Sequence, residues 1–203
     1  MKRRIFLVAV MALCLVFSAC GEKDTPSSRP EDTLETFQAL VDKIEYSGIF
    51  LTNFEPGSCD STAAFYGTGV FLMGSDRMEE TYKYSTNTHI ANGIEDYPYT
   101  PAAIFDAAFQ PYFVMKADQL HTMMKNYDPD IDGYWAPQGG GGIGGKTDVT
   151  AYEVNGNTAT LLCENPIPIS DTHEIQSYAE VQMEYSEEYG WRFVSCRVSD
   201  QPL

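Results

Sequence analysis

The last third of the chain alternates between apolar and polar residues, and this alternation restricts the fold more than any other feature of the sequence. Residues 148–154 and 157–163 flank Asn155-Gly156. This dipeptide favours a two-residue turn between antiparallel strands, because both of its residues tolerate positive φ. We therefore expect the two segments to pair as a β-hairpin.

A second pair of strands is expected directly after this hairpin. In residues 178–185 the apolar side chains alternate with polar ones, and a loop at residues 186–190 leads into residues 191–198. Cross-strand neighbours contact one another on each face of such a pair. The expected pairs are Tyr185 with Trp191, Met183 with Phe193, and Glu184 with Arg192. One face is then apolar, and the other is mixed polar.

The part of the chain before these strands has helical periodicity. In residues 34–44 apolar side chains recur at spacings of three and four, after Pro30 and two acidic residues. Residues 49–94 contain short apolar runs broken by glycine and serine. This pattern favours neither a helix nor a strand. The apolar residues of the first helix are Leu34, Phe37, Leu40, Val41 and Ile44.

Two shorter helices are expected in the middle of the chain. Thr100-Pro101 predicts an N-cap followed by proline at the first helical position, in a helix that Pro111 ends. A further helix is predicted from about Lys116 to Asn126. Helices followed by an antiparallel meander predict an α+β fold, with N-terminal helices packed on a C-terminal sheet. The length suits a single domain.

The N-terminus has the pattern of a bacterial secretory signal. Basic residues at positions 2–4 precede an apolar stretch at 5–16 and a cleavage site at 17–20, with the sequence FSAC. The apolar stretch is too short to cross a bilayer core of about 30 Å as a helix, so we expect cleavage.

The residues around the cleavage site, Phe17-Ser18-Ala19-Cys20, resemble the lipobox of bacterial lipoproteins. The resemblance implies that Cys20 receives a diacylglyceryl thioether, and two acyl chains anchor a protein stably. The expected organisation is a signal peptide at 1–19, a lipidated tether at 20–30 and a globular domain at 31–203. The domain is then held by lipid at the extracytoplasmic face of the cell membrane. The alternative is an ordinary cleaved signal in which Cys20 has no role.

The charge of the chain limits its partners. Residues 1–19 contain three of the 13 lysines and arginines and none of the 29 acidic residues. The mature chain therefore has 10 basic and 29 acidic residues, a formal charge of −19. Such a surface is repelled by nucleic acid, whereas a basic protein or a cation is attracted to it.

Three cysteines, Cys59, Cys163 and Cys196, belong to the globular domain. An odd number cannot all pair within one chain. Cys163 and Cys196 lie in expected strands and could form a disulfide. The alternative is three reduced thiols that pack as small apolar side chains.

Catalytic signatures are missing from the sequence. It contains no G-x-S-x-G, S-x-x-K, C-x-x-C or H-E-x-x-H pattern, since Ser177 stands where the last pattern needs its second histidine. Cys59 could act as a thiol nucleophile only with a histidine base, and nothing in the spacing brings His89, His121 or His173 to it. We therefore expect a binding protein with no catalytic residue.

Residues 140–147 match the phosphate-binding pattern G-x-x-x-x-G-K-[ST]. Such a loop works where it joins a buried strand to a helix, because the N–H groups of the helix N-terminus then face the phosphate. Here the preceding residues are Trp135-Ala136-Pro137, and a strand is expected afterwards. We interpret the segment as a glycine-rich surface loop.

Asp128, Asp130 and Asp132 stand at the spacing of the first three ligands of an EF-hand. Position 12 of such a loop would be Gly139 instead of a bidentate glutamate, and no helix is expected after it. These aspartates are candidates for a partial Ca²⁺ site, and the alternative is an acidic turn that ends a helix. Otherwise no metal or cofactor is expected.

Aromatic residues beside the glycine run are the expected partner-binding surface. Within residues 128–146, exposed aromatic side chains can anchor a partner, although such residues also pin loops to their own core. The candidate partner-binding residues are Tyr134, Trp135, Gly140, Gly141, Gly142 and Ile143.

Residues 100–103 (TPAA), 111–113 (PYF) and 130–135 (DIDGYW), with the terminal meander, resemble the IseA-like inhibitors of cell-wall D,L-endopeptidases over about residues 100–198. This resemblance implies binding to a cell-wall hydrolase. The order of helices and strands also resembles NTF2-like and cystatin-like domains, in which a curved sheet holds a helix. That second resemblance implies a pocket for a small envelope ligand between helix and sheet.

Overall fold

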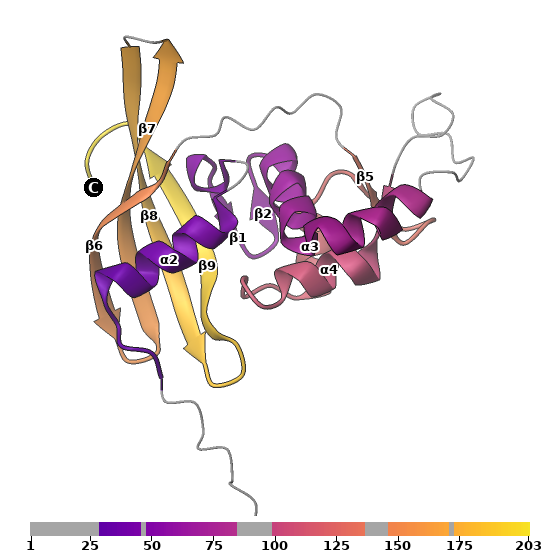
Figure 1. Cartoon of the computed structure of the whole chain (residues 1–203), viewed down its shortest axis with the longest axis horizontal. Helices are drawn as coiled ribbons and strands as arrows, with labels where there is room; N and C mark the ends of the chain where they lie inside the picture. Colours follow the sequence, from indigo (N-terminus) through magenta and orange to yellow (C-terminus); the bar gives the residue numbers. More distant parts are fainter. Residues whose placement is uncertain (1–28, 46–47, 85–98, 137–145, 171–172) are drawn as a thin grey trace, which may run out of the picture. The chain divides into compact units, whose positions relative to one another are not determined.

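The computed structural model describes the chain in five segments, residues 29–45, 48–84, 99–136, 146–170 and 173–203. Residues 31–203 form one compact unit. It contains helices and two sheets whose strands pair antiparallel, which confirms the predicted α+β class (Figure 1). No helix in these segments is long and apolar enough to cross a membrane.

The larger sheet has six strands in the order β2-β1-β9-β8-β7-β6. Its last four strands form the predicted C-terminal meander, and a short hairpin from the middle of the chain extends it beyond β9. The strands are β1 (Phe54–Glu55), β2 (Ser58–Cys59), β6 (Asp148–Asn155), β7 (Thr158–Ser170), β8 (His173–Ser186) and β9 (Gly190–Ser199).

The register between β8 and β9 confirms the prediction. Tyr185 pairs with Trp191, Met183 with Phe193 and Glu184 with Arg192. The register shifts by one residue between Met183 and Gln182, because Met183 pairs with Phe193 whereas Gln182 pairs with Ser195. Pairs farther from the β8–β9 turn keep this shifted register. The apolar residues of this face, Ala179, Val181, Met183 and Phe193, are buried.

The turn between β6 and β7 lies one residue later than predicted. Asn155 pairs with Thr158, so the two turn residues are Gly156-Asn157. Gly156 has a φ of 61°, and glycine adopts this value without a steric penalty. Asn155 instead ends the strand.

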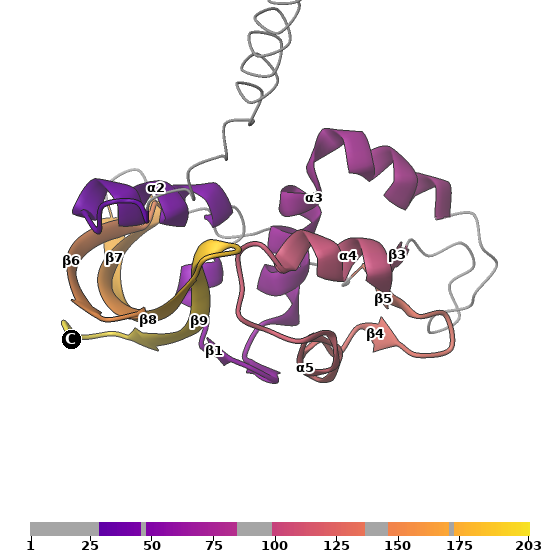
Figure 2. The ribbon, with the colours of Figure 1, turned by 90° about the horizontal axis from the view of Figure 1, so that it is seen from below.

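Helix α2 (Leu34–Ile44) covers one face of the meander, and the sheet curves around it (Figure 2). Thr33 caps its N-terminus by accepting a hydrogen bond from the Thr36 amide at 3.1 Å. Phe37, Val41 and Ile44 are fully buried, as the spacing predicted. The Phe37 ring packs edge-on against Trp191, with centroids 5.5 Å apart.

The middle of the chain, which the sequence left largely unassigned, forms the short helix η1 (Ile49–Leu51), the β1–β2 hairpin and helix α3 (Thr62–Tyr84). Helix α3 packs against α4 (Ala102–Phe109). At their contact, a Cβ atom on Gly69 would lie 2.4 Å from the Phe105 ring, so only glycine permits this approach.

The two shorter helices confirm the predictions except at their ends. Pro101, the last residue of a short strand, occupies the N-cap position of α4, so the helix begins one residue later than predicted. Helix α5 (Ala117–Met123) begins after Lys116 as predicted and ends three residues before Asn126. The small sheet β3-β5-β4 lies beside these helices, and its strands are β3 (Tyr99–Pro101), β4 (Tyr127–Asp128) and β5 (Gly133–Trp135).

Aromatic packing and main-chain hydrogen bonds join the small sheet and its helices to the meander. The amide of Phe193 in β9 donates to the carbonyl of Tyr112 at 2.7 Å, and the Val114 amide donates to the carbonyl of Phe193 at 2.8 Å. The Phe113 ring lies between Phe109 and Phe193, with centroids 4.9 and 5.8 Å away. One continuous core therefore extends through both halves of the unit.

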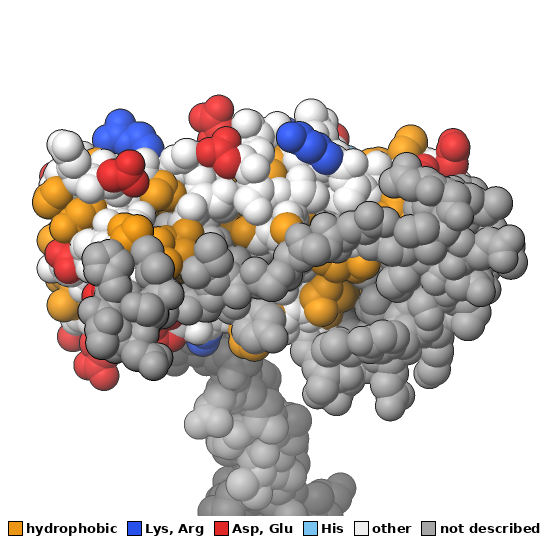
Figure 3. All heavy atoms as spheres, turned by 90° about the horizontal axis from the view of Figure 1, so that it is seen from above, with side chains coloured by type: hydrophobic (Ala, Val, Ile, Leu, Met, Phe, Trp, Pro, Cys, Tyr) orange, Lys and Arg blue, Asp and Glu red, His pale blue; other side chains and the backbone are white. Residues whose placement is uncertain are grey.

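Charged side chains are distributed over the surface. On the face shown in Figure 3, the described acidic side chains are spread among hydrophobic and uncharged ones and form no continuous field. On this face, an acidic binding surface among the described residues is therefore expected to be local.

Candidate functional site

The predicted partner-facing loop begins in the small sheet, and its two aromatic residues have different environments. Tyr134 is fully buried and Trp135 is half-buried. Alternation along β5 turns Tyr134 into the core, where its ring centroid lies 4.4 Å from that of Phe105. Because Tyr134 is buried, it cannot be one of the exposed aromatic side chains that were predicted to bind a partner. A partner-binding role for Trp135 remains a prediction. Gly140, Gly141, Gly142 and Ile143 lie outside the described residues.

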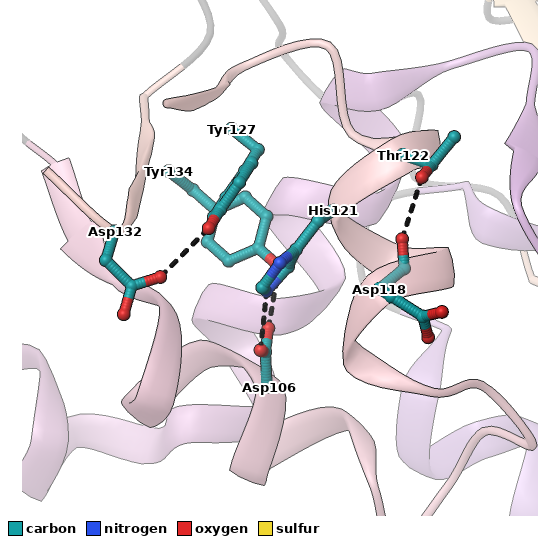
Figure 4. Close-up of polar contacts among 7 residues, drawn as sticks. All are labelled: Asp106, Asp118, His121, Thr122, Tyr127, Asp132 and Tyr134. Atoms are coloured by element: carbon teal, nitrogen blue, oxygen red, sulfur yellow. Dashed lines mark hydrogen bonds and ion pairs between the residues drawn. The ribbon is translucent and has the colours of Figure 1, made fainter. Parts of the chain in front are cut away.

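A polar network surrounds the Tyr134 hydroxyl, and Asp106 of α4 lies at its centre (Figure 4). Tyr134 donates from its hydroxyl to Asp106 Oδ1 at 2.6 Å. His121 Nε2, from α5, lies 2.8 Å from Asp106 Oδ2. The two oxygens of one carboxylate thus tie β5 and α5 to α4.

Tyr127 of β4 extends this network toward the surface. Its ring stacks on the His121 imidazole, with centroids 3.9 Å apart and the planes 12° from parallel. Its hydroxyl donates to Asp132 Oδ1 at 2.9 Å. We call Asp106, His121, Tyr127, Asp132 and Tyr134 the Asp106 cluster.

The acidic turn, residues 128–132, connects β4 to β5 at the edge of this cluster. Asp128 Oδ2 accepts from the Trp135 indole N–H at 3.0 Å, and its Oδ1 accepts from the Asp130 amide at 2.9 Å. The Ala102 amide donates to the carbonyl of Asp132 at 2.8 Å. These bonds fix the turn, while the side chains of Asp130 and Asp132 remain exposed.

The partial Ca²⁺ site at the aspartates of this turn remains a prediction. In the described part of the chain, no group of three or more His, Cys, Asp or Glu side chains is placed to hold a metal ion. Asp128 and Asp132 direct oxygens to Trp135 and Tyr127. The acidic turn joins β4 to β5, whereas α5 ends at Met123, so the turn does not end a helix as the alternative predicted.

The phenols of the cluster are held in their protonated forms. Burial, together with the hydrogen bond to Asp106, raises the pKa of Tyr134 above its ordinary value. The hydrogen bond to Asp132 raises the pKa of Tyr127. Both hydroxyls therefore keep the proton that they donate to Asp106 and Asp132, which suits a structural role for the two tyrosines.

The three cysteines of the domain are free. Cys59 donates from its thiol to the carbonyl of Met123 at 3.7 Å, and burial raises its pKa. Burial also raises the pKa of Cys163 to about 12, and it raises the pKa of Cys196. A thiol nucleophile needs the opposite shift, because the thiolate is the reactive form.

Sequence reasoning missed Asp106 and Tyr127, and it considered His121 only as a possible base for Cys59. Each belongs to a different element, and neither spacing nor a motif indicates that these elements meet. The side chains of His89 and His173 and the lipid site Cys20 lie outside the described residues. No protein-family model, curated protein or solved structure matches the chain.

Proposed function

We propose that the mature chain is a lipid-anchored extracytoplasmic protein that binds a basic partner and catalyses no reaction. The proposed partner is a cell-wall hydrolase, whose activity the bound protein modulates. The observation that carries this proposal is the acidic turn, a fixed and exposed carboxylate surface next to Trp135.

Rigidity of the turn supports binding. Hydrogen bonds from Trp135, Tyr127 and Ala102 hold it before any partner arrives. A surface that is already ordered loses less conformational entropy on association, so more of its interaction energy contributes to affinity.

The charge of the turn supports a basic partner. Among the described residues, none of Asp128, Asp130 and Asp132 forms an ion pair with a lysine or arginine. The formal charge of −19 on the mature chain adds a long-range attraction for cations. Complementary charge raises the rate of encounter and selects the partner.

The alternative function, a pocket between helix and sheet, has less support. Phe37, Val41 and Ile44 of α2 are fully buried against the meander, and the facing residues Leu161 and Val181 are fully buried as well. These side chains belong to one hydrophobic core cluster, which supports a packed layer at the place where an NTF2-like domain would hold its ligand.

Capture from an envelope extract tests the proposal. The chain from residue 21, immobilised, is compared with the double variant Asp130→Asn/Asp132→Asn. Asparagine is chosen because Asp132 has a φ of 47°, which asparagine tolerates well. We expect basic envelope proteins on the wild type, and at least about tenfold weaker binding to the variant at low salt.

The matched control is Glu153→Gln/Glu187→Gln, which removes two charges from exposed positions outside the turn. It should keep wild-type affinity. Partners that bind all three proteins equally, with unchanged melting temperatures, would refute the role of the turn.

A further inference from the structure

An open groove lies at the far edge of the meander, and the proposed function does not use it. It has a volume of about 400 Å³ and lies between the β1–β2 hairpin and the face of β8 and β9 opposite α2. Small-molecule sites typically have volumes of about 300–1,000 Å³. Phe54 and Cys196, both buried, belong to its lining.

Charged groups of both signs line the groove. Glu55, Asp60 and Glu180 supply three carboxylates, and Arg197 supplies one guanidinium. Arg197 Nη2 lies 3.8 Å from Glu180 Oε2. This separation is too long for a hydrogen bond, so the guanidinium N–H groups can still donate to a ligand.

The walls of the groove are fixed. Asn53 accepts at Oδ1 from the Val198 amide at 2.7 Å and donates from Nδ2 to Asp60 Oδ2 at 2.7 Å. Phe54 pairs with Cys196, which joins the hairpin to β9. Asn53 therefore holds the carboxylate of Asp60 in place, and the side chain of Arg197, which is 68% exposed, lies on the same surface.

We propose that this groove binds a small zwitterion, namely an amino acid or short peptide with free termini. Arg197 binds the ligand carboxylate, because a guanidinium matches the geometry of a carboxylate. Glu180 and Asp60 bind the ammonium group. Three carboxylates against one guanidinium leave an excess of negative charge, so an anion without an ammonium group is repelled.

Amide chemical shifts of the ¹⁵N-labelled chain from residue 21, which retains the whole compact unit, test the proposal with three probes. Glycylglycine carries both charges, glycylglycine amide only the ammonium, and N-acetylglycylglycine only the carboxylate. We expect glycylglycine to shift the amides of Phe54, Ser58, Ser195 and Cys196. Blocking either end should weaken binding at least about fivefold.

Two variants test which side chain binds the ligand carboxylate and which binds its ammonium group. Arg197→Gln should bind glycylglycine no better than it binds glycylglycine amide, and Glu180→Gln should lose the preference for a free ammonium group. Glu184→Gln is the matched control, because it lies on the same strand beyond the groove and pairs with Arg192. It should bind as the wild type does.

The proposal is overturned if no probe shifts these amides up to about 20 mM, a concentration that would detect even millimolar affinity. It is equally overturned if the blocked probes bind as tightly as glycylglycine, or if Arg197→Gln and Glu184→Gln behave alike. None of these results bears on the acidic turn, whose residues do not line the groove.

Discussion

Glu45, at the C-terminal end of α2, is a carboxylate in an unfavourable environment. Burial raises its pKa from 4.5 to about 7, and repulsion from Asp42 and Asp148 adds to the shift. Hydrogen bonding to Thr147 and the charge of Lys146 oppose it in part. Among the described residues, Glu45 Oε1 has no hydrogen-bond partner. Deprotonation of Glu45 therefore costs free energy in the folded state.

This shift predicts the direction of a pH dependence. A carboxyl whose pKa is higher in the folded state than in the unfolded state stabilises the fold below the unfolded pKa. That contribution is lost as the pH rises through the folded pKa, here between about 4.5 and 7. Because Glu45 is partly exposed, solvent screening reduces the effect, which we expect to be about 1 kcal/mol.

Denaturant unfolding at pH 5 and pH 8 measures this effect. Glu45→Gln should lose about 1 kcal/mol less stability than the wild type between these pH values. Glu35→Gln, on the exposed side of the same helix, serves as the control and should keep the wild-type dependence. Parallel curves for the wild type and Glu45→Gln would contradict the assignment.

At the scale of elements, the packing of β8 and β9 against the helical core makes a second prediction. Phe193 is 1% exposed and contacts Phe50 and Phe113, so Phe193→Ala should lower the free energy of unfolding by about 3–5 kcal/mol. Gln182 points to the opposite face, where it accepts from Thr160 at 3.1 Å. Gln182→Ala should cost about 1 kcal/mol or less.

Thermal and denaturant unfolding of the two variants are compared directly. Equal losses would mean that the two faces of the sheet do not differ in burial, which would contradict the register. A melting temperature that falls much further for Phe193→Ala than for Gln182→Ala supports it.

The meander could be predicted from the sequence because its signals are local. Strict alternation sets which face each side chain occupies, and loop length sets the register of Met183 with Phe193. Helix α3 could not be predicted, since Gly67, Gly69 and Gly74 lower its helix propensity. Glycine is needed at position 69 because α4 packs so closely there that a Cβ atom would clash with the Phe105 ring.

The candidate site was predictable only in part, because local sequence signals do not show which elements pack together. The acidic turn stands out in the sequence, but strands of two or three residues give no period from which to decide that Tyr134 faces inward and Trp135 does not. The partners that settle this, Asp106 and His121, come from two other helices. Their contact with Tyr134 is a property of the tertiary fold.

At the scale of the whole molecule, the proposed function depends on where the compact unit is held. The unit spans residues 31–203, and the preceding segment from Gly21 to Pro30 is polar, with two prolines and two serines. The proposed attachment depends on Cys20, because two acyl chains together give stable membrane binding.

The last prediction therefore concerns Cys20. Cys20→Ala should abolish membrane attachment, because no other residue is proposed to carry lipid, and the variant should remain in the soluble fraction. Fractionation after growth with radiolabelled palmitate measures both lipid incorporation and location in the wild type and the variant. Cys59→Ala is the matched control, since its thiol bonds the Met123 carbonyl inside the fold, and it should stay labelled and membrane-bound. A Cys20→Ala protein that still pellets with membranes and incorporates the label would refute the lipoprotein assignment.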